Sequence, residues 1–143
     1  MLTSHIDYEG NLRTQATHLQ SGTTILTDAP TDNHGRGEAF SPTDLTATSL
    51  GTCIITTMGI SGQREGLDFA GSSLSVTKVM STTAPRRIAR VEVEIQMKTN
   101  VELTDELRAK YESIAQTCPV ALSLHPDVEQ VIRIEWPIEQ MSE

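Results

Sequence analysis

The stretch that decides the fold is residues 41–64, SPTDLTATSLGTCIITTMGISGQR. Ser41 can cap a helix, Pro42 suits the first helical position, and the acidic Asp44 follows the cap by three residues. After this start, the apolar residues recur at gaps of three and four, which predicts one face of a helix; they are Leu45, Ala47, Leu50, Cys53, Ile54, Met58 and Ile60. The residues between them are mostly small. We therefore expect an interior helix that approaches another helix closely and ends near residues 64–66.

Before this helix, the sequence predicts three short strands and a loop. The strands are placed at Ile6 to Tyr8, at residues 16–19 and at residues 23–27, because turn-forming residues separate these segments. Residues 28–40 carry Pro, Asp, Asn and Gly and are predicted to form a loop of a length that is often functional.

After the helix, residues 74–80 predict a strand. Residues 89–97 alternate apolar with polar side chains, which indicates a half-buried antiparallel strand with one face in water. A second helix is predicted from Thr104, and its buried side is expected to consist of Leu107, Tyr111, Ile114 and Ala115.

The pair Cys118-Pro119 breaks this second helix and is predicted to start a short third one, which ends near His125. Residues 128–136 form the last predicted strand. The resulting order, β-β-β-α-β-β-α-α-β, keeps strands and helices apart, so the expected class is α+β, with residues 1–143 as a single domain.

Composition limits the function. The chain has 11 basic and 19 acidic residues, a net charge of −8, which argues against nucleic acid and anionic membranes as partners. No apolar run approaches the roughly 20 residues that cross a bilayer, and residues 1–10 lack the apolar core of a signal peptide, so the cytoplasm is the expected compartment. The four histidines are scattered, and neither a metal nor a cofactor is expected.

The two cysteines carry the chemistry that remains. In a reducing compartment a purely structural disulfide between Cys53 and Cys118 is not expected. By position alone, Cys53 could be an ordinary small core residue. Cys118 precedes a helix-starting proline, where N–H groups would point at its sulfur and lower its pKa, so position alone favours Cys118 as the nucleophile.

Two motifs together resemble the OsmC/Ohr family. One is GRGEAFSPTDL at residues 35–45, followed by the small-residue helix that contains Cys53. The other is Cys118-Pro119-Val120 at the start of a short helix, just before the final strand. The resemblance covers most of the chain, from the first hairpin to Trp136.

This resemblance implies an OsmC-like fold, with antiparallel sheets around a central buried helix that carries Cys53, and an intertwined homodimer with two active sites at its interface. It implies reduction of organic hydroperoxides, with Cys53 as the peroxidatic cysteine that becomes a sulfenic acid. Cys118 would then resolve the sulfenic acid as a disulfide, and a small dithiol would reduce that disulfide. A shielded apolar pocket around a buried helix suits alkyl peroxides, which favours Cys53 over Cys118 as the nucleophile.

The family's peroxidases also use an arginine from the amino-terminal part to stabilise the thiolate. Arg13, in the predicted first hairpin, matches better than Arg36, and Glu38 could hold the arginine in place. Those peroxidases place a Glu directly after the helix-starting Pro, where this chain has Thr43. The alternative function is therefore a dimer without peroxidase activity that binds or senses a small apolar or electrophilic ligand at the interface pocket. A third possibility is that both cysteines are ordinary core residues.

Overall fold

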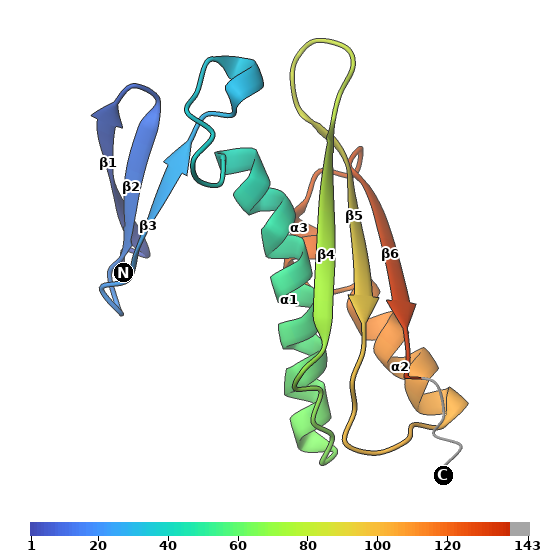
Figure 1. The fold of residues 1–143 in the computed structure, drawn as a ribbon. Coiled ribbons are helices and arrows are strands. Elements are labelled where there is room, and N and C mark those ends of the chain that lie inside the picture. The colour runs from blue at the N-terminus through green and yellow to red at the C-terminus, as the bar shows by residue number, and fades with distance from the viewer. Residues whose placement is uncertain (138–143) are drawn as a thin grey trace. The chain divides into compact units, whose positions relative to one another are not determined.

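The computed structural model describes residues 1–137 and divides the chain into two compact units, one of Met1–Thr46 and one that begins at Ala47. The predicted order of strands and helices is confirmed (Figure 1). The elements are β1 (Ser4–Gly10), β2 (Arg13–His18), β3 (Thr24–Asp28), a short 3-10 turn (Thr31–Asn33), α1 (Pro42–Arg64), β4 (Ser73–Met80), β5 (Ile88–Gln96), α2 (Asp105–Gln116), α3 (Pro119–Ser123) and β6 (Glu129–Glu135). None of the helices in residues 1–137 is both long and apolar enough to span a membrane.

The amino-terminal unit is built on an antiparallel sheet in the order β1-β2-β3. The register places Ile6 opposite Ala16 and Ala16 opposite Ile25, so these three side chains share one face. Ile6 and Ile25 are 61% and 47% exposed, and the buried residues of the unit are the polar Thr27, Asp28 and Ser41. By itself, this unit therefore has no hydrophobic core.

The predicted loop of residues 28–40 differs from the structure at its start. Asp28 is the last residue of β3, paired with Arg13 of β2, because the ladder continues one residue beyond the apolar pattern. The rest of the loop folds back on itself, and the N–H of Gly37 donates to the carbonyl of Ala29. Gly35 is required here, because a Cβ at this position would lie 1.7 Å from the oxygen of Ala29.

The second unit contains the sheet β4-β5-β6. β4 and β5 are antiparallel as predicted, but β5 and β6 are parallel, so the expectation of purely antiparallel sheets is wrong. The reason is the connection. α2 and α3 lie between β5 and β6, and such a helical crossover lets the chain re-enter the same sheet in the same direction.

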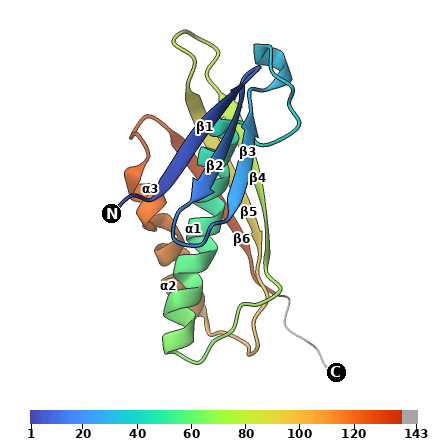
Figure 2. The same cartoon turned by 90° about the vertical axis from the view of Figure 1, so that its left-hand side faces the viewer.

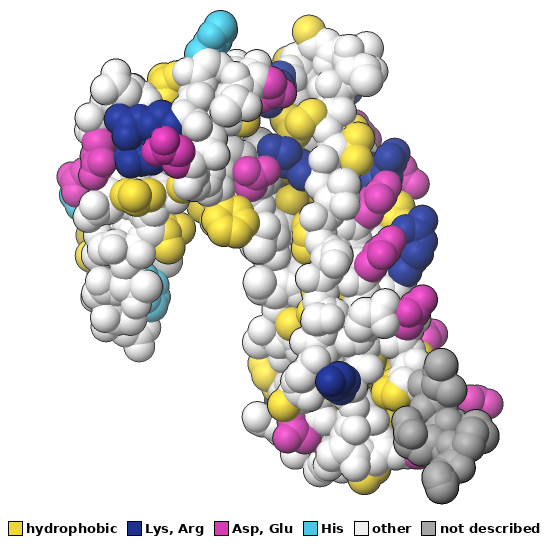
Figure 3. Space-filling view, in the orientation of Figure 1, with side chains coloured by type: hydrophobic (Ala, Val, Ile, Leu, Met, Phe, Trp, Pro, Cys, Tyr) yellow, Lys and Arg dark blue, Asp and Glu magenta, His cyan; other side chains and the backbone are white. Residues whose placement is uncertain are grey.

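α1 and α2 pack on one face of this sheet (Figures 1 and 2). The alternation predicted for β5 is confirmed, because Val91, Val93 and Ile95 are fully buried and Glu94 and Gln96 are exposed. The buried hydrophobic residues are Ala47, Leu50, Ile54, Met58, Leu67, Phe69, Val91, Val93, Ile95, Met97, Leu103, Tyr111, Ala115, Cys118 and Ala121. The opposite face carries charge: Arg90–Glu92 and Glu94–Arg133 are ion pairs, and Figure 3 shows acidic and basic side chains over β5 and β6.

The small residues of α1 act differently from the prediction. A Cβ on Gly51 would lie 2.9 Å from Cγ2 of Val76, so the helix approaches the sheet closely rather than another helix. Burial is also one-sided, because Leu50, Ile54 and Met58 are fully buried whereas Thr52 and Thr56 are exposed. A central position for α1, covered on all sides, stays a prediction tied to the homodimer.

Candidate thiol site and arginine cluster

The start of α1 is fixed by the predicted cap. The N–H of Asp44 donates to Oγ of Ser41 at 3.0 Å, and the N–H of Ser41 donates to Oδ2 of Asp44 at 3.0 Å. This reciprocal pair is a capping box. Asp44 therefore has the capping role that its spacing predicted, and the cap sets where Cys53 falls along the helix.

Cys118 is the N-cap of α3, as predicted. Its sulfur accepts the N–H of Ala121 at 3.4 Å, and Pro119 occupies the first turn. Cys118 is fully buried in the core of the second unit, whereas Cys53 on α1 is only partly buried.

The structure brings the two free thiols together. Interactions with the main chain of Val120 and with the side chain of Cys118 act on the Cys53 thiol, and its sulfur lies 3.8 Å from Oγ1 of Thr57. Burial acts to raise the pKa of the Cys53 thiol, but these contacts outweigh burial, so its pKa is lowered. Cys53 is therefore the thiol that ionises more readily.

Cys118 shifts in the opposite direction. Burial raises the pKa of the Cys118 thiol, the N–H of Ala121 opposes that effect, and the neighbouring Cys53 raises the pKa further. The helix-cap position alone had predicted a lowered pKa for Cys118. The cap contact is present, but burial and the adjacent sulfur are stronger, so the pKa of Cys118 is raised rather than lowered.

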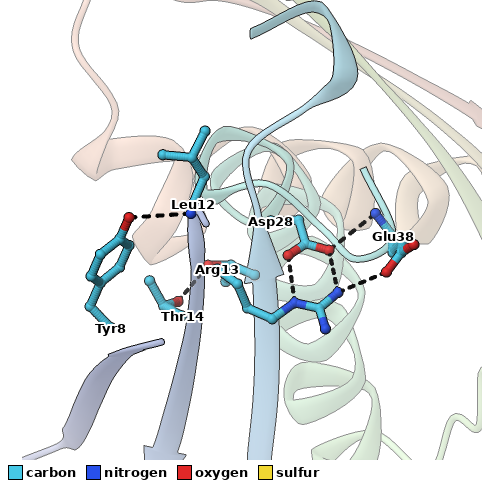
Figure 4. A network of polar contacts seen from close by, with 7 residues as sticks. Tyr8, Leu12, Arg13, Thr14, Asp28 and Glu38 are labelled. Atoms are coloured by element: carbon cyan, nitrogen blue, oxygen red, sulfur yellow. Dashed lines mark hydrogen bonds and ion pairs between the residues drawn. The ribbon is translucent and has the colours of Figure 1, made fainter. Parts of the chain in front are cut away.

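Arg13 belongs to a cluster in the amino-terminal unit (Figure 4). Its Nε and Nη2 donate to Oδ1 and Oδ2 of Asp28, both at 2.7 Å, and Nη2 also donates to Oε1 of Glu38 at 3.1 Å. The N–H of Glu38 donates to Oδ2 of Asp28 at 3.1 Å. The predicted contact between Glu38 and an arginine is thus present, with Arg13 as that arginine.

Asp28 is the residue of this cluster that the sequence did not reveal. Its side chain is fully buried, while the side chains of Arg13 and Glu38 are 17% and 68% exposed. The hydrogen bonds from Arg13 hold the pKa of Asp28 below its usual range against the effect of burial, and Arg36 contributes to this lowering through its charge. The one available signal was an acid at the end of an alternating strand, directly opposite an arginine.

The arginine cluster lies in the unit of Met1–Thr46, and the thiol pair lies in the unit that begins at Ala47. Within residues 1–137, no group of three or more His, Cys, Asp or Glu side chains is arranged to hold a metal ion.

Comparison with known proteins gives a family and a fold. The family model described as OsmC-like protein matches residues 35–132. A protein from Psychrobacter arcticus 273-4, provisionally named an osmotic stress induced and detoxification response protein, is 50% identical, with a TM-score of 0.88 over 94% of this chain and 96% of that one. A search of curated proteins found no match.

Two more distant structures share the fold. An organic hydroperoxide resistance protein OsmC from Legionella pneumophila has 13% identity and a TM-score of 0.71, over 94% of this chain and 97% of that one. An OsmC-like protein from Mycoplasma pneumoniae has 13% identity and a TM-score of 0.74, over 93% of this chain and 94% of that one.

Proposed function

Because the chain belongs to the OsmC-like protein family, we propose that it is a cysteine-based peroxidase that reduces organic hydroperoxides in the cytoplasm. The observation that carries this proposal is the thiol pair. Two cysteines 65 positions apart lie close enough to influence each other's ionisation, and their pKa values shift in opposite directions. If both cysteines were only small core residues, the fold would not require their two thiols to lie close together.

The first step uses the more acidic thiol. The thiolate of Cys53 attacks the distal oxygen of the hydroperoxide ROOH, the O–O bond breaks, and Cys53 becomes a sulfenic acid. The leaving alkoxide takes a proton and departs as the alcohol ROH. The peroxide is reduced by two electrons, and the sulfur is oxidised by two.

The second step uses Cys118. Its sulfur attacks the sulfenic sulfur of Cys53, water leaves, and the Cys53–Cys118 disulfide forms. The mutual influence of the two thiols on each other's pKa supports this role, because the resolving sulfur must approach Cys53 to bonding distance. A small dithiol then reduces the disulfide by exchange and returns both thiols.

The assembly that we propose is a homodimer. The amino-terminal sheet presents Ile6, Tyr8 and Ile25 on one face and buries no hydrophobic side chain. Burying such a face in a second copy would give this sheet the hydrophobic contacts that it lacks. The partners in this proposal are thus a second copy, a hydroperoxide and a dithiol.

Within this proposal, Arg13 stabilises the thiolate of Cys53, and Asp28 and Glu38 hold Arg13. Support comes from the bidentate contact with Asp28, which fixes the orientation of the guanidinium. The cluster and the thiol pair belong to different compact units, and a loss of peroxide turnover on mutation of Arg13 would support the proposed action of Arg13 on Cys53.

The deciding experiment measures consumption of cumene hydroperoxide by the reduced protein with a dithiol reductant. We expect Cys53→Ser to abolish turnover. In a second assay without added thiol, Cys118→Ser should consume about one peroxide per Cys53 and then stop. The sulfenic acid still forms on Cys53, but the chain has no second cysteine to convert it to a disulfide. Thr52→Ser, an exposed change on the same helix, serves as the control and should keep full activity.

The alternative function is binding or sensing of a small apolar or electrophilic ligand. One observation favours it: Thr43 stands where the family's peroxidases have a Glu, and the next acid, Asp44, is part of the capping box. Absence of turnover by the reduced wild type, together with stoichiometric modification of Cys53 by an electrophile and a raised melting temperature with that adduct, would select this alternative.

A further inference from the structure

We infer that Thr57 is a functional residue of the thiol site, because its hydroxyl group is placed to donate a hydrogen bond to the ionised sulfur of Cys53. The inference deepens the proposed function and rests on it for its catalytic consequence. Its physical basis, the contact between hydroxyl and sulfur, does not depend on which reaction the sulfur performs.

The contact follows from the helix. Thr57 lies four residues after Cys53 in α1, so the two side chains lie on the same side of the helix, one turn apart. Oγ1 of Thr57 is 3.8 Å from Sγ of Cys53. Both side chains are partly buried, on a stretch of helix where Thr52 and Thr56 face the solvent.

Other threonines of α1 use their hydroxyl groups differently. Thr46 donates to the carbonyl of Pro42 at 3.1 Å, and Thr52 donates to the carbonyl of Ser49 at 3.1 Å. Bonding back to the main chain is the usual use of a threonine inside a helix. Thr57 instead places its hydroxyl against a sulfur, so its orientation serves the side chain of Cys53.

The direction of the hydrogen bond makes this contact selective for the thiolate. A neutral thiol has its own proton and can act as donor or acceptor toward a hydroxyl group. A thiolate has no proton, so the hydroxyl group must donate, and a hydrogen bond donated to the charged form favours ionisation. Cys53 needs such donors because burial acts against its ionisation.

Among the groups that contact the sulfur of Cys53, Thr57 has a distinct place. The N–H of Val120 belongs to the main chain, and the thiol of Cys118 is consumed when the disulfide forms. The hydroxyl group of Thr57 is not oxidised at any step of the cycle. It therefore stays available to Cys53 at every step, whereas the Cys118 thiol returns only when the disulfide is reduced.

The test measures how fast iodoacetamide alkylates Cys53 as a function of pH. The protein is kept reduced, and the Cys53 peptide is quantified by mass spectrometry so that Cys118 does not contribute. Thr57→Val removes the hydroxyl group at similar volume, Thr57→Ser retains it, and Thr56→Val is the matched control on the exposed side. Thr57→Ala is a second removal variant, in case the valine disturbs folding, and thermal unfolding checks every variant.

We expect Thr57→Val and Thr57→Ala to move the midpoint of the alkylation profile upward by about one pH unit, which is about a tenfold loss of thiolate below the midpoint. Thr57→Ser and Thr56→Val should keep the wild-type midpoint. In the peroxidase assay, the pH profile of kcat/KM should shift upward with the same variants.

Unchanged midpoints in folded Thr57→Val and Thr57→Ala would overturn the inference, and so would Thr57→Ser shifting as far as Thr57→Val. Failure of the proposed function looks different. In that case the wild type turns over no peroxide, while the alkylation midpoint still depends on the hydroxyl group of residue 57.

Discussion

The two compact units of the chain are stabilised in different ways. From Ala47 onward, the described residues share one hydrophobic core, in which α1, β5 and α2 meet and which includes Cys118. In Met1–Thr46 the buried residues are polar, and the contacts are strand ladders, the capping box of α1 and the cluster of Arg13, Asp28 and Glu38.

This difference explains why the thiol pair and the arginine cluster depend on different interactions. The thiol pair lies at the packed core of the second unit, where burial, neighbouring donors and the two sulfurs themselves shift the two pKa values in opposite directions. The arginine cluster is set on a thin sheet without a core, where charged hydrogen bonds provide the order. The stability of the unit that begins at Ala47 should fall most when a buried side chain is shortened. The stability of Met1–Thr46 should fall most when a charge or a contact with a second copy is removed.

The largest effect is expected from the core of the second unit. Leu50→Ala removes a fully buried side chain, and the cavity that it leaves should cost about 2–5 kcal/mol of the free energy of unfolding. Urea denaturation measures this loss. Thr52→Ala, on the exposed side of the same helix, should change the free energy by no more than about 0.5 kcal/mol. Equal losses for the two variants would contradict the one-sided burial of α1.

The next effect concerns the amino-terminal sheet and its proposed second copy. If a second copy covers the apolar face, each tenfold rise in protein concentration should stabilise the folded dimer by about 1.4 kcal/mol. Ile25→Glu should abolish this dependence and halve the mass measured by light scattering. A wild type that is monomeric at every concentration would rule out the dimer.

A smaller effect is expected from the charge of Asp28. Its pKa is lowered in the folded protein, so its charge stabilises the fold fully above the ordinary aspartate pKa of about 3.9. That stabilisation is lost as the pH falls further, through the lowered folded pKa. Asp28→Asn should therefore weaken protection of the β2 and β3 amides from hydrogen exchange at neutral pH.

The same Asp28→Asn variant should also lose the acid-dependent part of that protection. Glu38→Gln is the matched control, because Glu38 is largely exposed and its ion pair with Arg13 should contribute less. A larger effect at Glu38 than at Asp28 would show that the buried carboxylate is not the main anchor of Arg13.

The smallest expected effect is a difference between the alkylation rates of Cys53 and Cys118. Because the pKa of Cys53 is lowered and that of Cys118 is raised, iodoacetamide at neutral pH should modify Cys53 at least about tenfold faster. Mass spectrometry of the two peptides over time measures the ratio. Faster reaction at Cys118 would restore the preference that the helix-cap position alone had indicated.

Local patterns in the sequence were enough for much of the fold. Ser41 and Asp44 interact across one helical turn, and Cys118 caps α3 within its own first turn. The alternation in β5 marks its buried face because side chains along a strand point to opposite sides. These features depend on residues a few positions apart, so the sequence alone contains them.

The remaining features depend on residues far apart in the chain. The parallel direction of β6, the approach of α1 to Val76 at Gly51, and the burial of Asp28 against Arg13 arise from packing between distant segments. The sequence by itself determined the family resemblance, the order of elements and the two cysteines. Only the tertiary structure decided which cysteine ionises first, because burial and the donors of α3 act on a sulfur 65 residues earlier in the chain.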